Sequence, residues 1–190
     1  NYTRTPRRHD FSLDPTGDTM MDALARKGLT TIGVGKISDI FAGRSISRTL
    51  GINKNNEDGM EKTLKVMDED FTGLCFVNLV DFDMAYGHRR DIDGYAKAAT
   101  VFDRQLGEFM AKMKDDDILM ITADHGCDPG APGTDHTREY VPLLMYGKHV
   151  KAGLNLGTYP TFAMIGATIS DIFNADLKTK GESLLPRILK

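Results

Sequence analysis

Four short apolar runs, rich in β-branched and aliphatic residues, recur along the chain. Runs of this length, bounded by Gly, Asp and Pro, predict strands that are buried on both faces. We expect strands at residues 29–35 (LTTIGVG), 73–80 (GLCFVNLV), 117–123 (DILMITA) and 141–146 (VPLLMY). Pro142 has no backbone N–H to donate, so the last strand is predicted to begin there or to lie at an edge of its sheet.

Between these runs, apolar residues recur at intervals of three and four, which is the pattern of amphipathic helices. We expect helices at residues 19–27, 60–67, 95–113 and 161–173, and a short tail helix within 182–190. Gly28 is placed to terminate the first helix. Strands that alternate with single helices predict an α/β fold, in which a mostly parallel sheet is sandwiched by helices.

Composition and charge narrow the class of protein. The chain has 190 residues, 41% hydrophobic and 27% charged, which is typical of a globular domain. Residues 1–18 lack periodicity and are predicted to be a hinge that enters one domain spanning residues 19–190. The net charge of −3 disfavours a nucleic-acid-binding protein, and no apolar run of about 18 residues predicts a membrane span.

The two cysteines form no CxxC motif, and no signal peptide is evident at the start of the sequence. Free thiols in such a chain fit a cytoplasmic location. A disulfide between Cys75 and Cys127 stays open at this point.

Histidines and carboxylates gather directly after two predicted strands, and open α/β sheets bind ligands at the carboxyl ends of their strands. These residues are Asp81, Asp83, His88, Asp124, His125 and His136. Each one alone is more often a cap or a surface residue, but the set indicates a metal site. Neutral imidazoles with carboxylates suit a divalent ion such as Mn²⁺ or Zn²⁺, and this number of ligands suits two ions that share a phosphoryl group. The absence of thiolate ligands argues against a structural zinc site.

Several further polar residues have two possible roles each. Lys36 follows the first strand, where it can meet a phosphate as a point charge or lie in a solvated loop. Its GVGK sequence lacks the spacing of a P-loop. The basic residues Arg4, Arg7 and Arg8 can likewise bind phosphate or lie in a solvated hinge.

Three segments, NLVDFDMAYGHRRD, ITADHGCDPGAPGTDHTREYVPLLMY and GKISDIFAGR, resemble the phosphopentomutase family of the alkaline phosphatase superfamily. The resemblance extends over essentially the whole chain, in the same order. It implies an alkaline phosphatase-like core and an isomerase that interconverts ribose (or deoxyribose) 1-phosphate and 5-phosphate through a phosphoenzyme. It also implies two Mn²⁺ ions, with Zn²⁺ or Mg²⁺ as alternatives, and a sugar bisphosphate activator.

The resemblance also assigns roles to individual residues. Asp83, His88 and His136 would hold one ion, and Asp124 and His125 would hold the other. Lys36 would contact the substrate phosphate. Asp81 is expected to be a supporting acceptor or a turn cap rather than a ligand, and Thr137 or Asp135 to support the ligands. The family often has Asn at the position of Cys127.

The family's phosphorylated threonine and one further metal-binding aspartate belong to an N-terminal segment whose motifs are absent from this sequence. We therefore expect this chain to be the C-terminal core portion, without the nucleophile, and residues 1–18 to be the end of an inserted cap domain. The expected partners are a phosphosugar and the missing N-terminal half with its cap. On this hypothesis the isolated chain binds metal and is inactive.

Two other functions remain open from the sequence. One is another metal-dependent phosphatase or phosphoglycerate mutase of the same superfamily, because the short ADHG motif is shared within it. The other is a noncatalytic metal-binding fragment. The longer matches GHRRD and GTDHTREYVPLL favour the pentomutase.

Overall fold

The computed structural model describes residues 12–190, so Arg4, Arg7, Arg8 and most of the predicted hinge lie outside the described residues. The described chain divides into two compact units. The first contains residues 12–52, 70–77 and 149–190, and the second contains residues 53–69 and 78–148. The predicted division into a hinge and one domain from residue 19 stays a prediction.

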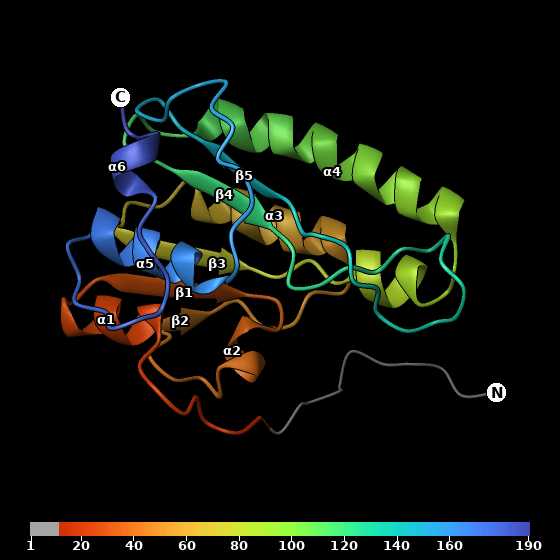
Figure 1. The fold of residues 1–190 in the computed structure, drawn as a ribbon, viewed down its shortest axis with the longest axis horizontal. Coiled ribbons are helices and arrows are strands. Elements are labelled where there is room, and N and C mark those ends of the chain that lie inside the picture. Colours follow the sequence, from red (N-terminus) through yellow and green to blue (C-terminus); the bar gives the residue numbers. More distant parts are fainter. Residues whose placement is uncertain (1–11) are drawn as a thin grey trace. The chain divides into compact units, whose positions relative to one another are not determined.

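A parallel sheet forms the centre of the first unit (Figure 1). Its strands are β1 (Thr30–Val34), β2 (Arg48–Thr49) and β3 (Gly73–Val77), in the order β2-β1-β3. β1 pairs in parallel with both neighbours, which confirms the parallel sheet predicted from the apolar runs. Among the described residues β3 has one hydrogen-bonded neighbour, and it is half-buried along its length rather than fully buried as its sequence suggests.

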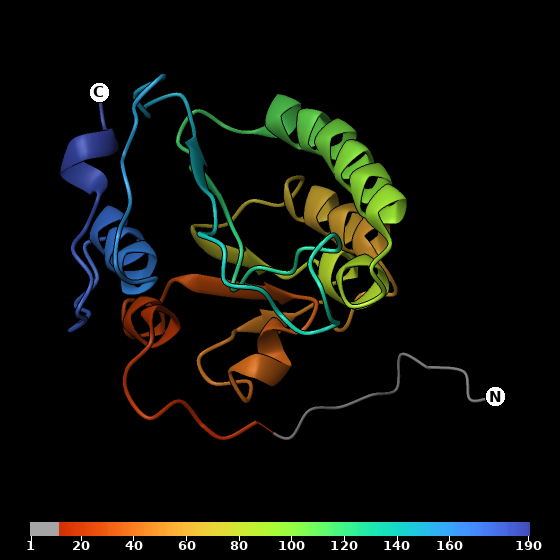
Figure 2. The ribbon, with the colours of Figure 1, turned by 45° about the vertical axis from the view of Figure 1, so that its right-hand side comes forward.

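Helices flank this sheet, as the alternating pattern predicts. α1 (Met20–Arg26) contacts β1 and lies beside α5 (Ala163–Ile172), as Figures 1 and 2 both show. The first unit also contains the short helices α2 (Ile37–Ile40) and α6 (Leu185–Ile188). The core consists mainly of aliphatic side chains from these elements, including Met21, Leu24, Val34, Leu184 and Ile188.

Gly28 ends α1 as its position predicts. Its φ of +70° is in the left-handed region, which glycine adopts without steric cost. The N–H of Gly28 donates to the carbonyl of Ala25 at 2.9 Å, and the N–H of Leu29 donates to the carbonyl of Leu24 at 3.1 Å. These two bonds are those of a Schellman motif, which satisfies the last carbonyls of the helix.

The second unit contains an antiparallel strand pair, β4 (Leu119–Thr122) and β5 (Leu143–Tyr146). The sequence predicts a sheet that is mostly parallel, and this pair is antiparallel and separate from the parallel sheet. The connection between β4 and β5 contains no helix, whereas parallel neighbours are usually joined by a helical crossover. Pro142 directly precedes β5, in agreement with its predicted place at the start of a strand.

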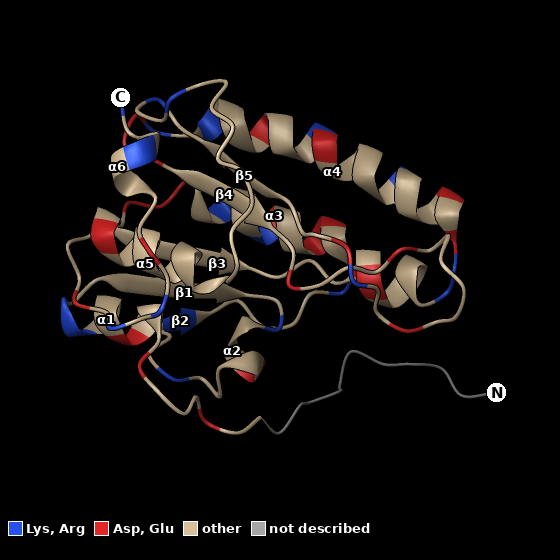
Figure 3. Ribbon diagram, in the orientation of Figure 1, with Lys and Arg blue, Asp and Glu red and all other residues tan. Residues whose placement is uncertain are grey.

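Two long helices pack side by side in the second unit, α3 (Asn56–Val66) and α4 (Ile92–Lys112) (Figures 1 and 2). Both begin earlier than the apolar pattern indicates, because polar N-cap residues add a first turn without apolar side chains. The Asn55 side chain accepts from the N–H of Asp58 at 2.8 Å, and that of Asp91 accepts from the N–H of Gly94 at 2.9 Å. Acidic and basic residues are interspersed along α4 (Figure 3).

No helix within residues 12–190 is long and apolar enough to cross a membrane.

A buried carboxylate joins α1 to the loop that precedes β2. Asp22 is 6% exposed, and its carboxylate oxygens accept hydrogen bonds from Thr19, Arg44 and Ser45 at distances of 2.6 to 3.0 Å. Its own N–H donates to the Oγ1 of Thr19 at 3.3 Å. Burial by itself raises the pKa of Asp22, but the hydrogen bonds from Ser45, Thr19 and Arg44 outweigh it and lower the pKa from 3.8 to about 2. The carboxylate therefore stabilises the first unit in its ionised form.

This network predicts a specific acid dependence. Because the folded-state pKa of Asp22 is below its ordinary value, its contribution of about 2 kcal/mol is complete above pH 4 and is lost as the pH falls toward 2. The substitution Asp22→Asn places an amide donor against these donors, so we expect lower stability at pH 7 and a weaker loss between pH 4 and 2. Urea unfolding at each pH measures both effects.

Asp103→Asn, at an exposed position of α4, is the control and should leave the stability unchanged. Parallel pH curves for Asp22→Asn and the parent would contradict the prediction.

Candidate metal centre

A short π-helix, η1 (Phe82–Gly87), contains the predicted ligand Asp83, and the predicted ligand His88 is its C-cap residue. The N–H of His88 donates to the carbonyl of Asp83 at 3.0 Å, which is the i→i+5 bond of this helix type. This bond aligns Asp83 and His88 on one side of the turn. In an α-helix, residues five apart point about 140° away from each other. The spacing of the two ligands therefore suits a π-helix.

Aromatic packing and a glycine hold η1 in place. The ring centroid of Phe82 lies 5.3 Å from that of Tyr95 and 6.3 Å from that of Phe102. Both of these partners belong to α4. Gly87 is buried, and a Cβ at this position would collide with the Sγ of Cys127 and with the carbonyl oxygen of Phe82. No larger residue fits at the end of η1 without moving the segment that carries His88.

Asp83, His88 and His136 converge on one point. Their ligand atoms all lie within 4.8 Å of one another. The Oδ1 of Asp83 is 3.2 Å from the Nε2 of His88 and 3.1 Å from the Nε2 of His136. The structure thus brings together the three residues that the resemblance groups around one ion.

The hydrogen-bonding pattern shows that this cluster suits a cation. The Nδ1 of His88 lies at the carbonyl oxygen of Thr134, which can only accept, so Nδ1 carries the proton. In neutral His88 the Nε2 lone pair therefore faces the Asp83 carboxylate. The Oδ1 of Asp83 is buried and accepts no hydrogen bond within the described residues. Acceptors that face each other in this way repel unless a proton or a metal ion lies between them.

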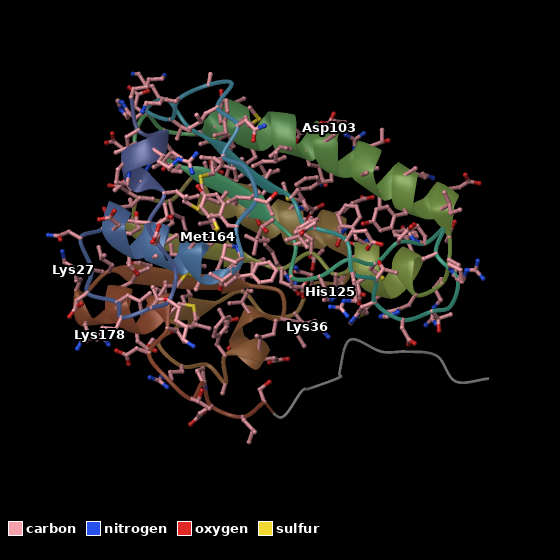
Figure 4. The ribbon with its side chains drawn as sticks, viewed as in Figure 1. Lys27, Lys36, Asp103, His125, Met164 and Lys178 are labelled. Atoms are coloured by element: carbon pink, nitrogen blue, oxygen red, sulfur yellow. The ribbon has the colours of Figure 1, made fainter. Side chains whose placement is uncertain are left out.

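His125 lies beside this cluster, on the loop that follows β4 (Figure 4). Its ring stacks on that of His136, with centroids 3.6 Å apart and planes 25° apart. Its Nδ1 is 3.1 Å from the carbonyl oxygen of Gly126, which leaves the Nε2 lone pair available, and this Nε2 atom lies 3.5 Å from the Oδ2 of Asp124. The Asp124 side chain is 77% exposed. Among the residues that the structure describes, Asp124 and His125 are not part of any group of three potential metal ligands.

A loop that is closed by hydrogen bonds brings His136 next to His125. The N–H of Thr137 donates to the carbonyl of Gly126 at 2.9 Å, and the Thr137 hydroxyl accepts from the N–H of Asp128 at 2.8 Å. A Cβ at Gly126 would lie 2.8 Å from the carbonyl oxygen of Thr137, so this close approach needs glycine. Thr137, which the sequence suggested as a support, closes the loop that presents the two histidines.

Cys127 lies against the cluster as a thiol. Burial, a hydrogen bond to Asp83 and the negative charges of Asp83 and Glu139 raise its pKa to about 11. Without a bound cation, the side chain is therefore protonated at neutral pH. Neither Cys75 nor Cys127 forms a disulfide in the described part of the chain.

Two other predicted residues lie outside the cluster. Lys36 belongs to the first unit, directly before α2, and its contact with a substrate phosphate stays a prediction. The Oδ2 of Asp81 accepts from the N–H of Asn56 at 2.7 Å, so Asp81 supports another helix. Sequence reasoning missed the Thr134 carbonyl, because a backbone carbonyl leaves no trace in the residue types.

The crowding at Gly87 predicts that Gly87→Ala weakens divalent-metal binding by about ten-fold or more, because it moves the backbone next to His88. Mn²⁺ titration by calorimetry measures this effect. Gly107→Ala in α4 is the matched control, since nothing lies within 4 Å of a Cβ at that position. The control should retain its affinity and gain about 0.5–1 kcal/mol in helix stability. Equal affinities for the two variants would show that the tight end of η1 does not position the site.

Comparisons with known proteins agree with this geometry. A family model described as the metalloenzyme superfamily matches residues 24–177. The phosphopentomutases of Lachnoclostridium phytofermentans and Acetivibrio thermocellus are 54% and 52% identical over 190 and 189 residues, which is 100% of this chain and 48% of each relative. The phosphopentomutase of Carboxydothermus hydrogenoformans is 54% identical over 93% of this chain and 45% of its own length. The chain thus spans about half the length of the curated relatives it matches.

A solved structure shows the same fold. It is the PH0037 protein of Pyrococcus horikoshii, which aligns with a TM-score of 0.54 over 83% of this chain and 53% of that one, at 20% identity. With a family match across most of its length and a mixed α/β architecture, the chain belongs to the metalloenzyme superfamily, a branch of the alkaline phosphatase superfamily.

Proposed function

We propose that the protein is a phosphopentomutase, which interconverts ribose (or deoxyribose) 1-phosphate and 5-phosphate. The observation that carries this proposal is the convergence of Asp83, His88 and His136 in a chain that is 54% identical to a phosphopentomutase over its whole length. Because the chain spans about half of that relative, the proposed activity belongs to a protein that also carries the remaining half.

The proposed ligand sets follow the grouping of the side chains. Asp83, His88 and His136 hold one divalent ion, and Asp124 and His125 contribute to a second. Nitrogen and carboxylate donors suit Mn²⁺, with Zn²⁺ and Mg²⁺ as alternatives. When bound, such ions stabilise negative charge on a transferring phosphoryl group and lower the pKa of the attacking oxygen.

The chain's own residues orient this centre and the substrate. The Thr134 carbonyl fixes the ring of His88, the stacked rings of His125 and His136 hold each other, and the carbonyl of Gly126 fixes the tautomer of His125. Lys36 is proposed to hold the substrate phosphate through its positive charge. The family resemblance assigns a phosphorylated threonine to an N-terminal segment, so this nucleophile is proposed in the remaining half of the protein.

Three accompanying features belong to the same proposal. A sugar bisphosphate acts as the activator that maintains the phosphoenzyme. The enzyme works in the cytoplasm, which fits two cysteines that form no disulfide. The 190-residue chain by itself binds metal but does not turn over.

A ³¹P NMR time course tests the activity. The full-length gene product is mixed with Mn²⁺, ribose 1-phosphate and a small amount of sugar bisphosphate. Growth of the ribose 5-phosphate signal is the expected result, whereas growth of inorganic phosphate would replace the mutase with a hydrolase. The 190-residue chain, measured in parallel, should bind Mn²⁺ without turnover.

Substitution of the proposed ligands gives the second test. Asp83→Asn and His136→Ala should lower the mutase rate by roughly two orders of magnitude or more, because each removes a direct metal ligand. His149→Ala, at an exposed position in the first unit, is the matched control and should retain the parent rate. Unchanged metal content and rate in Asp83→Asn or His136→Ala would remove that residue from the site.

A further inference from the structure

Two hydrogen bonds join the start of α3 to the residue before η1. The N–H of Asn56 donates to the Oδ2 of Asp81 at 2.7 Å, and the N–H of Asp81 donates to the Oδ1 of Asn56 at 2.9 Å. Each residue thus contributes its backbone N–H and its side-chain oxygen, which closes a ring of two bonds. Asn56 is 7% exposed, so this pair is sheltered from competing water.

A second contact fixes the same two segments to each other. The Nδ2 of Asn53 donates to the carbonyl of Asn78 at 3.0 Å. A Cβ at Gly59 would lie 2.6 Å from that Nδ2 and 2.8 Å from the Cδ2 of Leu79, so α3 approaches this segment as closely as glycine allows. The backbone that enters η1 is therefore anchored at two points, Asn78 and Asp81.

The role of the Asp81 side chain is unusual for its position. Asp81 precedes η1 but makes no side-chain cap for that helix. Its carboxylate instead accepts the N–H of the first residue of α3, which has no partner within its own helix, and the positive end of the helix dipole favours this contact. The Oδ2 of Asp81 is therefore directed at α3. This orientation explains why Asp81 is not part of the metal cluster.

The metal cluster depends on how the backbone that enters η1 is fixed. The Oδ1 of Asp83 accepts no hydrogen bond from the described residues, yet it lies at similar distances of 3.2 and 3.1 Å from the Nε2 atoms of His88 and His136. Its location depends on the start of η1, together with the packing of Phe82 on α4 and the contact of Cys127 with Asp83. Asp81, two residues before Asp83, is the closest position on the N-terminal side whose backbone N–H and side chain are both hydrogen-bonded to another helix.

From this geometry we propose that Asn56 and Asp81 are positioning residues of the metal centre. Their reciprocal pair sets the start of η1, so that Asp83 and His88 face His136. This inference rests on the proposed metal site, and it concerns residues that act through the backbone and do not touch the ion.

Mn²⁺ binding by variants of the full 190-residue chain tests the pair. Asp81→Ala removes the acceptor for the α3 N–H, and we expect the dissociation constant for Mn²⁺ to rise by about ten-fold or more. Asp81→Asn keeps an oxygen that can accept this bond, so it should restore the affinity to within about three-fold of the parent. The visible absorption of bound Co²⁺ should shift in Asp81→Ala and return in Asp81→Asn, which reports ligand geometry directly.

Asn55→Ala is the matched control, because Asn55 caps the same helix through Asp58 and not through Asp81. It should destabilise α3 by about 1 kcal/mol and leave the Mn²⁺ affinity and the Co²⁺ spectrum as in the parent. If Asp81→Ala does not fold, Asn56→Ala removes the acceptor for the Asp81 N–H alone and should still weaken Mn²⁺ binding measurably.

The outcomes separate this inference from the proposed function. Equal Mn²⁺ affinity in Asp81→Ala, Asn55→Ala and the parent would overturn the positioning role while the metal site stands. Equal loss in Asp81→Asn and Asp81→Ala would assign the effect to the charge of Asp81 and would also overturn it. A parent chain that binds no Mn²⁺ would overturn the metal site itself.

Discussion

The buried oxygen of Asp83 that faces two imidazole nitrogens is the constraint on which the rest of the site depends. Two Nε2 atoms at 3.2 and 3.1 Å from one carboxylate oxygen repel it unless a proton or a metal ion lies between them. The features around the cluster serve this arrangement. The π-helix aligns Asp83 with His88, the loop closed by Thr137 returns His136, and the Thr134 carbonyl sets the tautomer of His88.

Much of this could be predicted from the sequence because residue type and spacing carry the information directly. The apolar runs located β1, β3, β4 and β5, and Gly28 marked the end of α1. The ligand residues were recognisable because histidines and carboxylates follow strands, at the edge where ligands bind in α/β proteins. The N-cap residues Asn55 and Asp91 also explain why α3 and α4 begin before their first apolar positions. Each cap adds a first turn of polar residues, which the apolar periodicity does not predict.

The remaining features depend on contacts that residue types do not specify. A π-helical turn at Phe82–Gly87 differs from an α-helical one in its backbone hydrogen bonds, which no side-chain period reveals in six residues. The contact between His88 and Thr134 uses a carbonyl, which every residue has. The antiparallel pairing of β4 and β5 follows from a connection whose course is determined by the Gly126–Thr137 bridge, a contact between residues eleven apart.

The two proposed ion positions differ in how completely the described residues prepare them, and this difference has a physical cause. The ligands of the first position are oriented by backbone contacts on both the η1 side and the His136 side, so little ordering remains when an ion binds. The second position has two neighbouring residues on one loop, and the Asp124 side chain is 77% exposed. A carboxylate that water surrounds gains less from a cation than a buried one, because it exchanges good hydration for the ion. On the proposed function, the second position is therefore the one whose affinity depends on groups from the rest of the protein and on the substrate phosphate.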